Sequence, residues 1–197
     1  TDMRANLSKH QQRFNPDLPL VLMTDDRDAD WAGAARRLPR GGLVVIRARD
    51  AARRRALAER LHGLAPLLIA GDPALAERIG AAGLHLPQVR MGEALHWRAR
   101  RPDWIITASA HSLAALMRAG ALDAVFLSPV FPTASHAGAP CLTPARAALI
   151  AARAPVPVYA LGGVTPANAG LLGPAFSGIA AIGAFLPAAS PVRRGSR

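Results

Sequence analysis

Short apolar runs recur along this chain, and each gives way to a longer stretch that often contains alanine and arginine. The runs carry few charges and lie at 20–24, 43–46, 67–70, 84–86, 104–107, 124–127, 158–161 and 179–182. Runs of this kind are typical of strands whose two faces are both covered. Between them, the spacing of apolar residues predicts helices at 51–62, 73–81, 112–119 and 143–153.

The alternation of strands and helices predicts the fold. Eight strands that alternate with helices about every 17 to 33 residues indicate an α/β protein, a single compact (β/α)8 TIM barrel. A doubly wound open sheet has the same alternation and is the alternative. We expect a polar N-terminal arm at 1–19, the barrel domain at 20–186 and a basic C-terminal tail at 187–197.

Composition narrows the range of partners. The formal net charge is +11, but the arginines are spread over the predicted helices. With 3 Trp, 1 Tyr and 5 Phe, the chain has too few rings for a platform on which nucleic-acid bases stack. No apolar run approaches the roughly 20 residues that span a bilayer, and 1–19 lacks the apolar core of a secretory signal. We therefore expect a cytoplasmic protein with no nucleic-acid and no membrane partner.

Two residue types that occur once exclude further classes. Cys141 is the only cysteine, so the chain has no internal disulfide and no multi-cysteine metal cluster. Lys9 is the only lysine and lies in the polar arm, whereas a Schiff-base mechanism needs a buried lysine amine. The chain is therefore not an aldolase of the Schiff-base kind.

Polar residues follow the predicted strands at their carboxyl ends, where barrel enzymes place their active sites. Arg47 and Arg49 leave the second strand on one face, and the planar guanidinium suits bidentate binding of phosphate. Thr107, Ser109 and His111 alternate in the same way at the fifth strand. His111 is interpreted either as a group that exchanges protons near neutral pH or as a loop histidine beside a helix start.

Backbone groups complete the predicted site. Gly162 and Gly163 follow the seventh strand, and Ile182 and Gly183 come at the end of the eighth. Barrel phosphate sites often use backbone amides at these two places, so we expect a phosphate cup here. His85, in the fourth strand, is interpreted as a positioned structural residue.

Four segments carry a resemblance to one family through their order and spacing. They are Gly-Leu-His-Leu at 83–86, Ser-Ala-His at 109–111, Ser-Pro-Val-Phe-Pro-Thr at 128–133 and Ala-Leu-Gly-Gly-Val at 160–164. On these motifs the chain resembles the thiamine-phosphate synthase/TenI family over 20–185. The resemblance implies a (β/α)8 barrel whose synthase members join a pyrimidine diphosphate to a thiazole phosphate with loss of pyrophosphate. The implied partners are these two molecules, and barrels of this type often pair as homodimers.

The resemblance also implies roles for single residues. Arg47 would bind the diphosphate and Ser109 would hold it after cleavage, with His111 as the third catalytic candidate. The implied substrate-binding residues are Arg49, Thr133, Ser135, His136, Gly163, Ile182 and Gly183. Of these, Thr133 and Ser135 would contact the thiazole phosphate, and the backbone amides of Gly163, Ile182 and Gly183 would cradle its phosphate.

The chain departs from the synthase pattern where that pattern binds Mg²⁺. Synthases carry Asn-Asp after the third strand and a second metal-binding aspartate after the fourth, and here these ligand positions are Gly71 and Arg90. Because Mg²⁺ depends on oxygen ligands, the missing carboxylates indicate a divergent member, and we assign no metal ligand. Arg90 is hypothesised to supply positive charge where the metal stood. Asp72 precedes a helical stretch and is expected to cap it.

Three functions stay open on the sequence alone. The first is a thiamine-phosphate synthase-type transferase in thiamine biosynthesis, which the Pro-Thr-x-Ser turn at 132–135 favours by its likeness to synthases. The second is a TenI-like, metal-independent thiazole tautomerase that uses His111. The third is a non-catalytic relative that binds a phosphorylated ligand through Arg47 and the glycine turns.

Overall fold

The computed structural model describes residues 20–39, 41–133 and 141–182. The predicted arm and tail lie outside this part of the chain, and so do Ser135, His136 and Gly183. Within the described ranges, none of the helices combines the length and the apolar character needed to cross a membrane.

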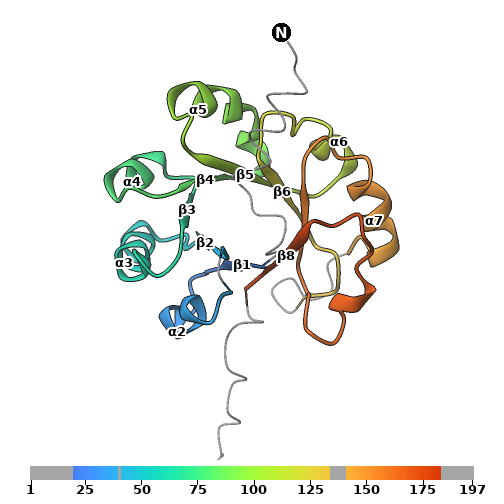
Figure 1. The fold of residues 1–197 in the computed structure, drawn as a ribbon, viewed down its shortest axis with the longest axis horizontal. Coiled ribbons are helices and arrows are strands. Elements are labelled where there is room, and N and C mark those ends of the chain that lie inside the picture. The colour runs from blue at the N-terminus through green and yellow to red at the C-terminus, as the bar shows by residue number, and fades with distance from the viewer. Residues whose placement is uncertain (1–19, 40, 134–140, 183–197) are drawn as a thin grey trace, which may run out of the picture.

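Eight parallel strands close into a barrel in chain order. The last strand pairs with the first, with Leu20 beside Ile179, so the sheet has no open edge. Figure 1 shows this closed ring with the helices outside it. The predicted TIM barrel is confirmed, and the open sheet is excluded. The strands are β1 (Leu20–Met23), β2 (Leu43–Ile46), β3 (Leu67–Ala70), β4 (Gly83–Leu86), β5 (Ile105–Ala110), β6 (Ala124–Leu127), β7 (Val158–Leu161) and β8 (Gly178–Ala181).

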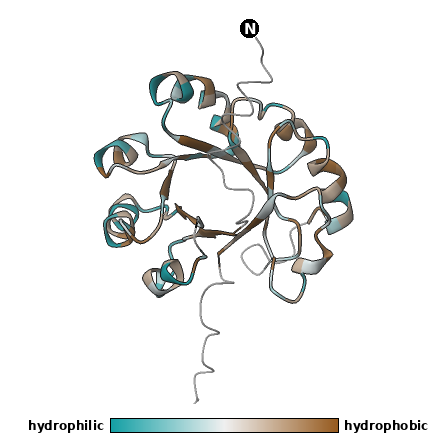
Figure 2. Ribbon diagram, in the orientation of Figure 1, coloured by the Kyte–Doolittle hydropathy of each residue, from teal (hydrophilic) through white to brown (hydrophobic). Residues whose placement is uncertain are grey.

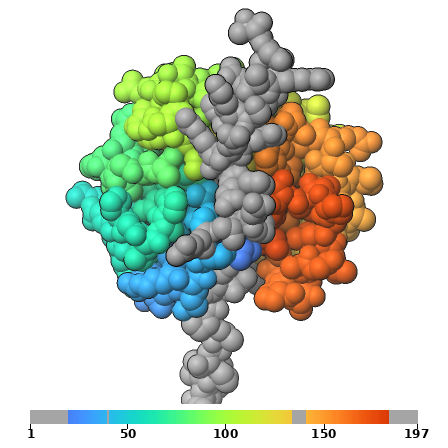
Figure 3. Space-filling view, viewed as in Figure 1, coloured from blue at the N-terminus to red at the C-terminus, as the bar shows by residue number. Residues whose placement is uncertain are grey.

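Short helices cover the outside of the ring (Figure 1), and the colours of Figure 3 show that the described segments follow one another around the molecule in chain order. Asp50, Asp72 and Ser112 each accept a hydrogen bond from a backbone N–H three residues later, so the cap predicted for Asp72 is confirmed. In the described ranges the helices are α2 (Trp31–Arg36), α3 (Ala51–Leu61), α4 (Pro73–Arg78), α5 (Ala94–Arg100), α6 (Leu113–Leu116) and α7 (Pro144–Ala151), with 3-10 helices η1 (Gln88–Glu93) and η3 (Ala169–Leu171).

The barrel wall separates two apolar cores. Val45, Phe126 and Tyr159 point inward and pack inside the barrel, whereas Leu22 and Val44 pack against the helices. Because both faces of the strands are covered, most strand residues are apolar and most of the strand ribbon appears brown in Figure 2. Side chains fill the interior, so the rim at the carboxyl ends of the strands is the place left for a ligand.

A buried carboxylate ties the amino ends of β5 and β6 together. Asp123 is 3% exposed and accepts hydrogen bonds from the backbone N–H of Ile106, at 2.7 Å, and from the guanidinium of Arg98. Arg98 also donates to the carbonyl oxygen of Trp104 at 2.9 Å. These residues lie at the end of the barrel opposite the polar rim. We therefore assign the Arg98–Asp123 pair to stability.

Asp123→Ala is expected to lower the free energy of unfolding by about 3 to 5 kcal/mol, because it leaves the guanidinium of Arg98 without its carboxylate. Urea denaturation followed by circular dichroism measures the change. Asp103→Ala is the matched control, since its side chain is 64% exposed in a surface pair with Arg101. Its loss is expected to change the free energy by less than about 1 kcal/mol. Equal effects of the two substitutions would contradict the assigned role of Asp123.

Candidate functional site

A cleft of about 430 Å³ lies at the carboxyl ends of the strands. Four predicted site residues line it, namely Arg47 and Arg49 after β2, and Ser109 and His111 at the end of β5. Ala70, the last residue of β3, contributes an apolar part of the wall. The barrel thus brings together residues that lie far apart in the sequence, in the region predicted from the strand ends.

Arg47 and Arg49 supply positive charge that no described residue pairs. Their backbone N–H groups donate to Oγ1 of Thr24, at 3.1 Å, and to Oδ1 of Asp26, at 2.8 Å. Neither guanidinium has a hydrogen-bond partner within the described ranges. Burial lowers the pKa of Arg47; of the neighbouring charges, Asp25 raises it and Arg49 lowers it. A partly desolvated cation without a partner is stabilised by a bound anion, so this side of the cleft suits phosphate.

A buried, neutral histidine lies next to Ser109. His85 is 2% exposed, and its Nδ1 and Nε2 lie 2.9 Å from Oγ1 of Thr107 and 3.0 Å from Oγ of Ser109. Its ring stacks on Phe126 with centroids 5.1 Å apart. Burial, followed by the charge of Arg47, lowers the pKa of His85 to about 3. The ring is therefore uncharged at neutral pH and orients the Ser109 hydroxyl, which is a positioning role.

His111 has one ring nitrogen engaged and the other available. Its Nδ1 lies 2.8 Å from the carbonyl oxygen of Ser128, and a carbonyl only accepts, so Nδ1 carries the proton. Nε2 is then the unprotonated nitrogen of the neutral ring, and no described residue binds it. The backbone N–H of His111 donates to Oε1 of Gln88 at 2.7 Å, which holds this residue in place. His111 can therefore accept a proton from a ligand through Nε2.

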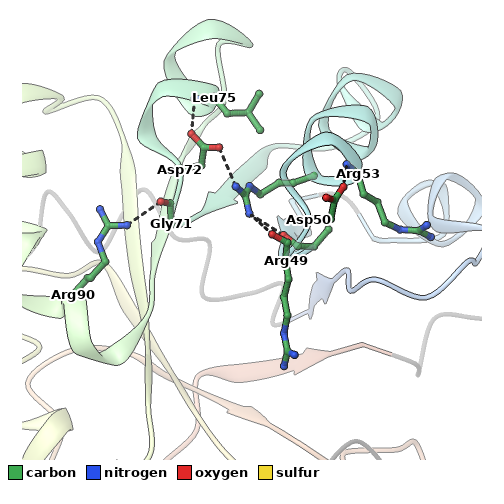
Figure 4. Close-up of polar contacts among 9 residues, drawn as sticks. Arg49, Asp50, Arg53, Gly71, Asp72, Leu75 and Arg90 are labelled. Atoms are coloured by element: carbon green, nitrogen blue, oxygen red, sulfur yellow. Dashed lines mark hydrogen bonds and ion pairs between the residues drawn. The ribbon is translucent and has the colours of Figure 1, made fainter.

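The two positions where the resemblance places Mg²⁺ ligands are bonded to each other. Nη1 of Arg90 donates to the carbonyl oxygen of Gly71 at 2.9 Å (Figure 4). Nε and Nη2 of Arg90 donate to the two carboxylate oxygens of Glu93 at 2.6 and 2.8 Å. The described residues contain no group of three or more His, Cys, Asp or Glu that could hold a metal ion. The residues present therefore do not fit Mg²⁺.

The same geometry bears on the hypothesis that Arg90 supplies charge in place of the metal. Arg90 is not among the residues that line the described cleft, and Glu93 balances its charge. Gly71 does line the cleft, and its φ of +67° is one that glycine adopts without strain. The unpaired charge in the cleft comes instead from Arg47 and Arg49.

The other described candidates lie on the β6 to β8 side of the rim. Thr133 and Ile182 are half-buried, and Gly163 has a φ of +65°. A Cβ at Gly163 would lie 2.2 Å from the carbonyl oxygen of Pro132, so glycine is needed for the loop after β7 to pack against the loop after β6. The Gly163 carbonyl accepts from Nδ2 of Asn168 at 2.9 Å. Thr133, Gly163 and Ile182 do not line the described cleft, and the structure does not unite them with the arginines.

Sequence reasoning missed three residues that shape the site: Arg54, Gln88 and Glu93. Arg54 and Gln88 line the cleft, and Glu93 holds Arg90. Glu93 follows Arg90 by three positions, a spacing at which side chains meet on a helical turn, so this pair is visible in the sequence. Gln88 binds a backbone group 23 positions away, and no local pattern predicts that contact.

Comparisons with known proteins agree with the fold and the motifs. The family model described as thiamine monophosphate synthase matches residues 20–185. The thiamine-phosphate synthase of Bordetella bronchiseptica is 34% identical over 169 residues, 73% of this chain and 74% of that protein. That of Chlorobium luteolum is 33% identical over 190 residues, 90% of each chain. A solved thiamine phosphate pyrophosphorylase from Pyrococcus furiosus superposes with a TM-score of 0.64 at 22% identity over 87% of both chains, which shows the shared fold.

The buried His85 predicts how stability depends on pH. Its pKa falls from 6.5 to about 3 on folding, so between these values only the unfolded chain binds the proton. The free energy of unfolding then decreases as the pH falls through this window, by up to about 1.4 kcal/mol per pH unit. Urea unfolding at pH values from 7 to 5 measures this slope, and His85→Gln is expected to make it shallower. His62→Gln, at an exposed position, is the control, and equal slopes for His85→Gln and the parent protein would contradict the prediction.

Proposed function

The chain belongs to the thiamine monophosphate synthase family, and on that premise we propose that it joins a pyrimidine diphosphate to a thiazole phosphate and releases pyrophosphate. The observation that carries the proposal is a cleft in which two arginines, unpaired among the described residues, lie on the same rim as the Ser109 hydroxyl. A diphosphate is a multiply charged anion, and it matches this pair of cations. Relatives that align with most of this chain are named thiamine-phosphate synthase.

Arg47 and Arg49 are proposed to hold the diphosphate. Guanidinium groups bind phosphate oxygens bidentately, and Arg47 is half-buried, so water competes less for its hydrogen bonds. When Nε2 of His85 carries the ring proton, it donates to Oγ of Ser109, 3.0 Å away. The hydroxyl proton of Ser109 is then free to bond an oxygen of the departing pyrophosphate.

The proposed reaction requires the protein to stabilise the charge of the leaving group and to orient the two substrates. The carbon–oxygen bond between the pyrimidine part and the diphosphate breaks, and both its electrons leave on pyrophosphate. The thiazole supplies the electron pair of the new bond. Arginines fixed beside the leaving group stabilise the charge that develops there. Binding of both substrates at one rim would hold the two rings close together, which reduces the entropic part of the barrier.

We assign the thiazole phosphate to the β6 to β8 side of the rim, at Thr133, Gly163 and Ile182. The backbone N–H of Gly163 has no hydrogen-bond partner within the described ranges, which leaves it available to a phosphate oxygen. Ser135, His136 and Gly183 belong to the same proposed subsite and lie outside the described residues. The homodimer and the cytoplasmic location stay predictions.

A metal-independent thiazole tautomerase is the second candidate, and the position of His111 favours it. Tautomerisation moves a proton on one substrate and needs neither a diphosphate nor a cation. The hydrogen bond from Nδ1 to the Ser128 carbonyl leaves Nε2 of His111 ready to take a proton.

The direct test is formation of thiamine phosphate from the two substrates, detected by mass spectrometry. Arg47→Ala is expected to lower kcat/KM by about 10- to 150-fold, because a hydrogen bond to a charged group contributes about 1.5 to 3 kcal/mol. Arg55→Ala removes the same charge from the exposed face of α3, where Arg55 pairs with Glu59, and is expected to leave kcat/KM unchanged. No product from the parent protein would remove the synthase assignment. Equal losses in both variants would point to a general effect of charge.

Proton exchange at the thiazole phosphate tests the second candidate. A tautomerase is expected to exchange ring-bound deuterium with water, and His111→Ala is expected to abolish the exchange by removing Nε2. Nuclear magnetic resonance follows the signal of the exchanging position. His96→Ala replaces an exposed histidine on α5 and serves as the control. Exchange that survives in His111→Ala would exclude His111 as the base.

A further inference from the structure

The rim beside Arg47 and Arg49 is occupied by an arginine–carboxylate pair. Asp72 is the carboxylate next to Gly71, and both of its oxygens are engaged. Oδ1 accepts from the backbone N–H of Leu75 at 3.0 Å, and Oδ2 accepts from Nη2 of Arg54 at 3.2 Å (Figure 4). A cation bound to Asp72 would lie beside the guanidinium of Arg54, whose positive charge opposes its binding.

A second pair, Arg90–Glu93, lies on the neighbouring part of the rim. Both carboxylate oxygens of Glu93 accept hydrogen bonds from Arg90. Oε2 also accepts one from Nε1 of Trp97, 3.3 Å away. These hydrogen bonds, that from Arg90 first, hold the pKa of Glu93 below its ordinary value, so it is ionised at neutral pH. The third nitrogen of Arg90, Nη1, donates a hydrogen bond to the carbonyl oxygen of Gly71. A cation bound to this carbonyl oxygen would lie beside the positive charge of Arg90.

The carboxylates after β1 are engaged as well. Asp25 accepts from Nε of Arg27 on both oxygens, at 2.9 and 2.8 Å, and Asp26 accepts from the backbone N–H of Arg49. Mg²⁺ prefers near-octahedral coordination with about six oxygens and usually takes one or two carboxylates from the protein. Around the described cleft, each nearby carboxylate already faces a cation or a backbone N–H.

We propose that the diphosphate site of this protein works without a divalent cation. Arg47 and Arg49 neutralise the diphosphate directly, while the Arg54–Asp72 and Arg90–Glu93 pairs fill the rim where a hydrated ion would lie. The inference rests on the proposed function, because that function places the diphosphate in this cleft. It implies that the cleft binds free pyrophosphate rather than its magnesium complex.

Calorimetric titration of the full chain with inorganic pyrophosphate tests the inference without any need for turnover. One series contains EDTA and the other contains Mg²⁺ in excess over pyrophosphate. We expect binding in EDTA at least as tight as in Mg²⁺, because the metal competes for the free anion. Arg47→Ala and Arg49→Ala are expected to weaken binding in EDTA by about tenfold or more, with Arg55→Ala unchanged. Arg49 is exposed, so Arg49→Ala provides a second test if Arg47→Ala does not fold.

The outcomes separate the inference from the proposed function. If Mg²⁺ tightens pyrophosphate binding by about tenfold or more, or if no binding occurs in EDTA, the inference is overturned whatever the turnover assay shows. If pyrophosphate binds in EDTA through Arg47 and Arg49 but no thiamine phosphate forms, the inference stands and the synthase function fails. Thiamine phosphate formed at equal rates in EDTA and in Mg²⁺ supports both the metal-free diphosphate site and the synthase function.

Discussion

Closure of the sheet is the constraint on which the rest of this protein depends. Once β8 pairs with β1, the strands must tilt, their inward side chains must fill the interior, and all eight carboxyl ends must meet at one rim. The arginines after β2 and the polar residues of β5 share a cleft for that reason. The Arg98–Asp123 pair lies at the other end of the barrel, where it stabilises the fold without contacting the rim that carries the candidate site.

Much of this architecture is predictable because a barrel has a strong one-dimensional signature. Buried parallel strands are apolar over most of their length, so hydropathy alone locates them to within a few residues. The fifth strand shows the limit of that signal. The apolar run predicts 104–107, whereas β5 extends over Ile105–Ala110, because pairing with β6 continues to Ala110 across the polar Ser109.

The candidate site likewise has one part that sequence patterns predict and one part that they do not. Arg47, Ser109 and His111 could be placed at the rim because strand geometry determines which side chains share a face. The hydrogen bond from Arg90 to the carbonyl oxygen of Gly71 depends instead on which partners the fold brings near. The net charge of +11 also says little about the cleft, since pairing leaves only some arginines to meet a ligand.

The fixed tautomer of His111 has a stereochemical consequence. With Nδ1 bound to the Ser128 carbonyl and the backbone N–H held by Gln88, the ring has one nitrogen and one orientation to offer. A proton that the imidazole exchanges with a ligand in the cleft must travel along that single direction. For a planar ligand held in one orientation in the cleft, the proton adds to, or leaves from, the face that lies toward Nε2, and the contacts of His111 with Ser128 and Gln88 fix that direction.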